Sequence, residues 1–150
     1  MSLLSELSKT IGTFNEVITT GVQGEVVVNV SSFVYNFGTD TTAGAIGTQQ
    51  LLVYPPIPAH SIVTNFVTNC TTALTGGSAT VAITLATTGD LHSASVVSSS
   101  PFTVGATSTL FATCITNPVD SNNIDSVNWT IAVAPLQTGV FTGYISWYGL

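Results

Sequence analysis

The chain has 150 residues, enough for one domain with a substantial core, and only 5% of them are charged, against roughly 25% in typical soluble domains. One cation, Lys9, stands against seven carboxylates, and the formal net charge of −6 disfavours binding to nucleic-acid phosphates or to an anionic membrane surface. No apolar run approaches the roughly 18 residues of a membrane span, and the abundance of Thr and Val indicates a β protein.

The first 24 residues differ from the rest of the chain. Apolar residues recur there every three or four positions, as on one face of a helix: Leu4, Leu7, Ile11, Phe14 and Ile18. A helix of this length is marginal alone in water, so it needs a partner surface. We therefore expect a short helical or extended N-terminal arm over 1–24, which either folds back on its own sheet or docks to another surface. Gly21 and Gly24 indicate a hinge between this arm and the main domain, 25–150.

From Glu25 onward the apolar pattern has a period of two, which is typical of strands. Val26, Val28 and Val30 share one face, as do Phe33, Tyr35 and Phe37. Residues 37–50 are rich in Gly and Thr and are expected to form a loop. Residues 54–58 contain three prolines, which lack the N–H of a ladder donor, so no central strand is expected there.

The remaining segments alternate between turns and short strands. Gly76 and Gly77 predict a turn, and about eight strands at roughly 8–12-residue spacing predict an all-β fold, an antiparallel β-sandwich or jelly roll. The expected core residues are Val28, Val30, Phe66, Val81, Ile83, Leu85, Leu110, Ile131, Ile145 and Trp147.

No catalytic, cofactor-binding or metal-binding set emerges from the polar residues. Asp90 and His92 share a face in an extended segment, but no third ligand can be named, and a turn Asp with a solvated His explains the pattern. The Asp120–Asp125 segment lacks the central Gly and the closing Glu of a calcium loop. The glycine-rich turns lack the Lys of a phosphate loop, and no nucleophile-elbow pattern is present. We expect no enzyme and no cofactor.

The two cysteines, Cys70 and Cys114, fall on expected strands. They can form a bridge in an oxidising compartment, but buried free thiols are common, and we expect two reduced core cysteines.

Two segments resemble a known group of proteins. "PPIPAHSIVTNFVTNCTTALTGGSATVAITL" (55–85) and "GVFTGYISWYGL" (139–150) are similar to an entry strand, a hairpin and a closing strand found in small virion proteins of tailed bacteriophages. The resemblance extends over about two-thirds of the chain, 54–150. It implies a β-sandwich that decorates the phage head as a cement protein or forms part of a fibre, usually as a trimer.

On this basis we expect a non-enzymatic protein of the capsid surface. Its expected partners are copies of itself, as a trimer, and the major capsid protein or other virion proteins, with no nucleic acid or membrane. The interface candidates are the five apolar arm residues and, on the closing strand, Tyr144 and Tyr148, while Trp147 is expected to point inward.

Two alternatives remain open. One is a fibre or sugar-binding module, in which exposed aromatic residues such as Tyr54 or Trp129 stack on sugar rings. The other is a secreted adhesin-like sandwich, for which a Cys70–Cys114 bridge is the sign.

Overall fold

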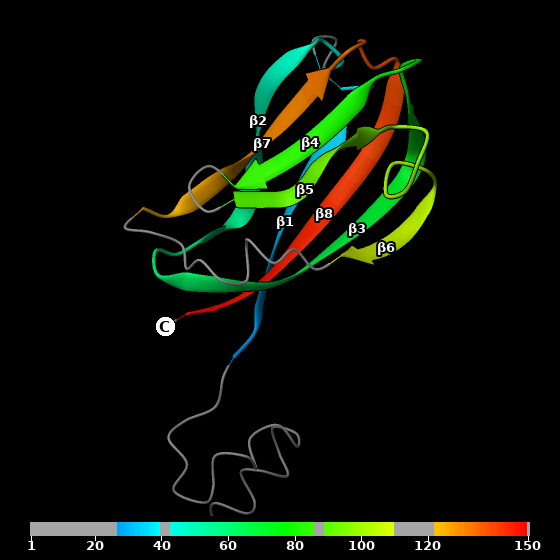
Figure 1. Ribbon diagram of the computed structural model, residues 1–150. Coiled ribbons are helices and arrows are strands. Elements are labelled where there is room, and N and C mark those ends of the chain that lie inside the picture. Colours follow the sequence, from blue (N-terminus) through cyan, green and yellow to red (C-terminus); the bar gives the residue numbers. More distant parts are fainter. Residues whose placement is uncertain (1–26, 40–42, 86–88, 110–121, 150) are drawn as a thin grey trace, which may run out of the picture.

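The computed structural model describes residues 27–39, 43–85, 89–109 and 122–149. These residues form eight strands and no helix, and so no described helix is long and apolar enough to span a membrane. The strands are β1 (Asn29–Asn36), β2 (Gly47–Ile57), β3 (Ser61–Thr75), β4 (Thr80–Leu85), β5 (Gly89–Val96), β6 (Gly105–Thr109), β7 (Ile124–Ala132) and β8 (Thr138–Gly149) (Figure 1).

The strand order identifies the fold as a jelly roll. β1 pairs with β8, β2 with β7, β3 with β6 and β4 with β5, all antiparallel, as in one long hairpin rolled upon itself. The roll produces the order β5-β4-β7-β2-β1-β8-β3-β6, whose two halves are joined where Ser32 of β1 pairs with Tyr54 of β2. The predicted antiparallel sandwich or jelly roll is confirmed.

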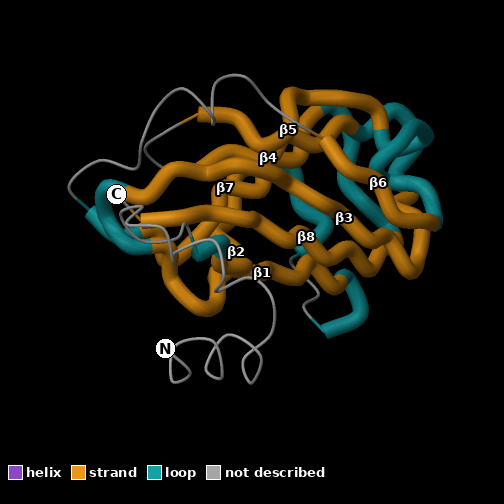
Figure 2. Tube along the Cα trace, turned by 90° about the horizontal axis from the view of Figure 1, so that it is seen from below, coloured by secondary structure: helices purple, strands orange, loops and turns teal. Residues whose placement is uncertain are grey.

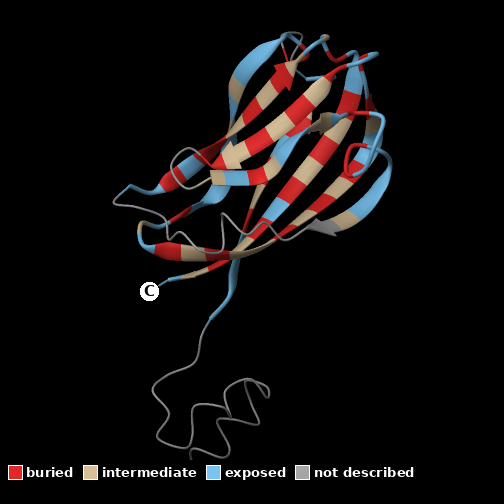
Figure 3. Ribbon diagram, in the orientation of Figure 1, coloured by how far each residue is buried: buried red, intermediate tan, exposed pale blue. Residues whose placement is uncertain are grey.

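The two halves curl toward each other and enclose one core (Figure 2). Tyr35 of β1 stacks on Trp129 of β7 with ring centroids 4.6 Å apart, and Phe141 of β8 lies 5.3 Å from the same indole. Buried and exposed residues alternate along the strands, as a half-buried sheet requires (Figure 3). Trp129, expected as an exposed aromatic, is fully buried, so that expectation is wrong.

Most of the predicted core is confirmed. The buried members are Phe66, Val81, Ile83, Leu85, Ile131, Ile145 and Trp147, and Leu110 lies outside the described residues. The predicted turn after β3 is also present. There the Ala79 N–H donates to the Gly76 carbonyl at 3.0 Å, and Gly77 has a φ of 62°, a conformation that favours glycine.

The assignment of Val28 and Val30 to the core is wrong, since their side chains are 55% and 51% exposed. Ser31, Phe33 and Tyr35 are the buried residues of β1. Because successive side chains of a strand point to opposite faces, Val30 lies on the face opposite to Phe33.

The predicted loop at 37–50 is wrong in its last part, because β2 already begins at Gly47. The expectation that 54–58 avoids a central strand is also wrong, because β2 continues to Ile57 between β7 and β1. The register of β2 on β7 shifts between Leu52 and Ile57. Pro55 and Pro56 lie inside this irregularity, where the strand pairing with β7 needs no N–H donor from them.

Candidate interaction surface

Four of the described strands, which make up one half of the jelly roll, carry no charged side chain. The strands β1, β8, β3 and β6 contain no Asp, Glu, Lys, Arg or His. In the described part of the chain the carboxylates are Asp90 on β5 and Asp125 on β7, both in the other half, and both are exposed. The outer side of these four strands is therefore a broad surface without charge.

Strand register places two tyrosines in one row across this surface. Tyr54 pairs with Ser32, Ser32 pairs with Tyr144, and Tyr144 pairs with Val67. Tyr54 is 79% exposed and Tyr144 is 39% exposed, whereas Ser32 and Val67 are half-buried. Neighbouring strands lie about 4.8 Å apart, so the two tyrosine backbones are about 10 Å apart with a small side chain between them.

Further exposed apolar side chains lie beside this row, along β2 and β1. Leu52 lies two positions before Tyr54 on β2 and is 81% exposed, and Val30 and Val34 on β1 are each 51% exposed. We call this surface the uncharged face and define it as the outward side chains of β1, β8 and β3 together with Leu52 and Tyr54. Exposed apolar patches of this kind mark interaction sites more often than isolated apolar residues do.

The structure shows where some of the predicted interface residues lie. Tyr144 belongs to the uncharged face, and Tyr148 lies on the same side of β8, half-buried beside its pairing partner Ile62. The predicted arm and its apolar residues, Leu4, Leu7, Ile11, Phe14 and Ile18, lie outside the described residues, as does the predicted boundary at 24–25. Leu52 and Val34 were not anticipated from the sequence, because their exposure depends on pairing between distant strands.

The inner side of the same strands is held by a short hydrogen-bond chain. Trp147 on β8 points inward, as predicted, and its Nε1–H donates to Ser31 Oγ at 2.8 Å. Ser31 is fully buried and in turn donates to the Pro55 carbonyl oxygen at 2.5 Å. These two hydrogen bonds link β8, β1 and β2 beneath the uncharged face and hold β2, the strand that carries Tyr54, against β1.

His92 is more buried than expected. Its Nε2 lies 2.8 Å from Ser95 Oγ, and its ring is nearly perpendicular to that of Phe102, with the two ring centroids 5.2 Å apart. Burial lowers the pKa of the imidazole from its ordinary value of 6.5 and so favours the neutral form.

Within the described residues, no group of three His, Cys, Asp or Glu side chains is placed to hold a metal ion. In the Asp120–Asp125 segment, the side-chain oxygen of Asn123 accepts the Ala59 N–H at 3.0 Å.

Cys70 is a free, buried thiol, whereas Cys114 lies outside the described residues. The Cys70 Sγ donates to the Phe102 carbonyl oxygen at 3.2 Å. Burial raises the pKa of the thiol, with a smaller opposing effect from a backbone hydrogen bond at Leu74, and so disfavours the reactive thiolate.

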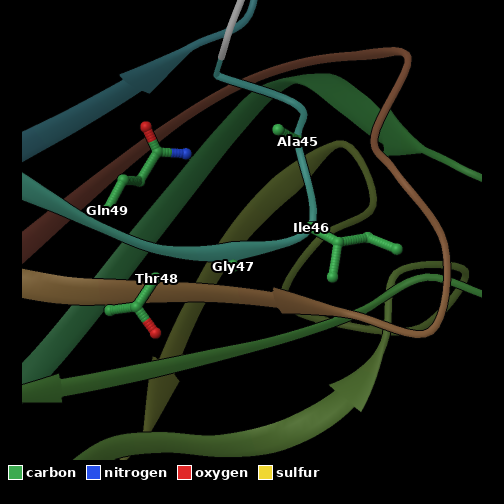
Figure 4. A pocket seen from close by; sticks show the side chains of 5 residues that line it. All are labelled: Ala45, Ile46, Gly47, Thr48 and Gln49. Atoms are coloured by element: carbon green, nitrogen blue, oxygen red, sulfur yellow. The ribbon is translucent and has the colours of Figure 1, made fainter.

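Two surface depressions lie along β2, and neither has a charged residue in its lining. One of about 150 Å³ lies at the start of β2, where Thr48 and Gln49 point to opposite sides of the strand (Figure 4). A second, of about 350 Å³, lies between β1 and β2 and includes Gln49, Val34 and Leu51 in its lining. Neither is lined by a charged residue, a histidine or a cysteine.

Comparison with solved structures finds the same architecture in a virus particle. The chain resembles one in the cyanophage Pam1 capsid asymmetric unit. The TM-score is 0.58 at 17% sequence identity, and the match covers 86% of this chain and 91% of that chain. No protein-family model and no curated protein sequence matches the chain. The two chains therefore share their fold.

Proposed function

We propose that this chain is a non-enzymatic structural protein of a bacteriophage virion, which decorates and stabilises the outside of the head as an oligomer, most simply a trimer. The observation that carries the proposal is a jelly roll of the kind found in a phage capsid assembly, with an uncharged outer face on one half. A decoration protein needs broad contact surfaces and no reactive site, and the cores of protein interfaces are depleted in charged residues.

The proposal assigns attachment to the N-terminal arm, residues 1–24. Its apolar seam would dock to the major capsid protein or another virion protein. Burying five large apolar side chains contributes about 5–10 kcal/mol before the costs of ordering the segment. That is enough to localise a subunit on a particle.

The test is a decoration experiment. The full-length chain is added to purified heads of its phage from which it has been removed or deleted, and occupancy is measured by quantitative gel analysis and electron microscopy. The expected result is saturable binding of the full-length chain to the head, with loss of binding when 1–20 are deleted. No binding by the full-length chain would overturn the decoration proposal, whereas full occupancy by the truncated chain would move the attachment surface to the jelly roll.

A second candidate function is sugar or receptor recognition as part of a fibre. It is favoured by the row of Tyr54, Ser32 and Tyr144, because two exposed aromatic rings on one sheet face are suited to stacking on sugar rings. Binding of the isolated protein to a glycan array, abolished by Tyr54→Ala, would support this function over decoration.

A further inference from the structure

The charges of the described residues are confined to one half of the jelly roll. Asp90 and Asp125 lie on β5 and β7, and no Lys or Arg is present among the described residues. The chain has a single cation, Lys9, and a formal net charge of −6, so two copies repel each other in general.

This distribution restricts how copies of the chain can meet. A contact that buried Asp90 or Asp125 against the described part of another copy would find no cation opposite the carboxylate. Burying a charge without a partner costs several kcal/mol, so such a contact is disfavoured. A contact through β1, β8 and β3 buries no charge at all, because these strands contain none.

We propose that copies of this chain associate through the uncharged face, with Tyr54, Tyr144 and Val34 at the centre of the contact. The inference deepens the proposed function, since it rests on the association of copies proposed there and names a surface at which two copies meet. A second copy is the occupant because it presents the same strands without carboxylates, so the two acidic chains meet there without bringing like charges together.

The size of the face agrees with this role. β8 has 12 residues, and at about 3.4 Å per residue it is about 40 Å long. β1 has 8 residues and β3 has 15, so at about 4.8 Å spacing the three strands cover roughly 570 Å², to which Leu52 and Tyr54 on β2 add their side chains. A stable interface needs about 800 Å² from each partner, and tyrosine is among the residues that anchor such interfaces.

The test compares one substitution at two exposed valines. Val34 on the uncharged face is 51% exposed, and Val96 on β5 of the other half is 45% exposed. Sedimentation velocity of the full chain at micromolar concentration should show an oligomer for the wild type and for Val96→Glu. Val34→Glu should raise the dissociation constant at least about 30-fold, toward the 15.5 kDa monomer.

A second variant guards against misfolding as the cause. Tyr144→Ser introduces no charge and should also weaken the oligomer, with an unchanged circular dichroism spectrum. A wild type that sediments as a monomer would overturn the inference, even if that monomer decorates heads and the decoration role stands. The inference is also wrong if Val34→Glu and Tyr144→Ser stay oligomeric. If those oligomeric variants no longer bind heads, the uncharged face contacts the phage shell instead of a second copy.

Discussion

The indole N–H of Trp147 donates to the hydroxyl of Ser31 at 2.8 Å, and the two residues lie 116 positions apart in the sequence. The same hydroxyl donates to the Pro55 carbonyl oxygen. One buried serine thus satisfies groups from two other strands, which explains why a polar residue occupies a fully buried position on β1.

We predict that Ser31 and Trp147 are energetically coupled. Ser31→Ala should cost about 1–3 kcal/mol of unfolding free energy, because it leaves the buried indole N–H of Trp147 without its acceptor. In a double-mutant cycle measured by urea unfolding, Ser31→Ala and Trp147→Phe should show a coupling of about 0.5–3 kcal/mol.

The control for this cycle is Trp129→Phe. The Trp129 indole N–H is buried without a hydrogen bond to any described residue. Its substitution should therefore be close to additive with Ser31→Ala. Additivity of the Trp147 pair as well would show that the hydrogen bond contributes nothing beyond packing.

Ile83→Asp should prevent soluble folding. Ile83 is fully buried on β4, and the substitution would place an unpaired carboxylate in the core. Ala82→Asp, one position earlier on the opposite face, should express in soluble form, because Ala82 is only half-buried. Soluble yield and thermal melting check both variants, and a normally folded Ile83→Asp protein would contradict the assigned inner face of β4.

Gly143→Ala should destabilise the fold by about 1–3 kcal/mol through overpacking. Gly143 pairs with Phe33 on β1, and a Cβ at this position would overlap the Phe33 ring and come within 2.8 Å of Phe66. The two phenyl rings are buried and stacked with centroids 6.0 Å apart, so neither has room to move away. At Gly149, where a Cβ would meet nothing within 4 Å, the same substitution should change the stability by less than about 0.5 kcal/mol. Equal melting temperatures for both variants would rule out the close packing.

His92 should make the protein less stable as the pH falls. Burial lowers the pKa of the folded-state imidazole below 6.5, so the unfolded chain binds a proton at a higher pH than the folded chain. The contribution of His92 is fully present above about pH 6.5 and is lost as the pH falls from there toward the folded-state pKa. The free energy of unfolding should therefore decrease between pH 7.5 and 5.5, and His92→Gln should flatten this dependence.

The control for the pH measurement is His60→Asn, which removes the exposed histidine and leaves His92 in place. This variant should retain the decrease seen in the wild type. An unchanged pH profile for His92→Gln would mean that His92 is not responsible for the dependence.

Local alternation was enough to predict some strands and not others. On β4, Val81, Ile83 and Leu85 form the only apolar series, so the period of two identifies the inner face directly. On β1, apolar residues occupy both faces, and Val30 could not be separated from Phe33 by hydrophobicity alone. The deciding residue is Ser31, whose burial depends on Trp147 and Pro55 from distant strands.

The candidate surface was less predictable than the fold. Tyr144 was chosen from the sequence as an aromatic residue beside an inward Trp147, and alternation on β8 places it outward. Its neighbours across the sheet, Ser32 and Tyr54, are set by register between strands far apart in sequence. Periodicity within one segment carries no information about such pairing.

Cryo-electron microscopy of the virion that carries this chain is the sharpest test of the proposed decoration of a phage head. We expect density for the eight-stranded jelly roll on the outer surface of the head, with copies meeting through the face that bears Tyr54 and Tyr144. Density for the chain in a tail fibre, with none on the head, would mean that it is not a decoration protein.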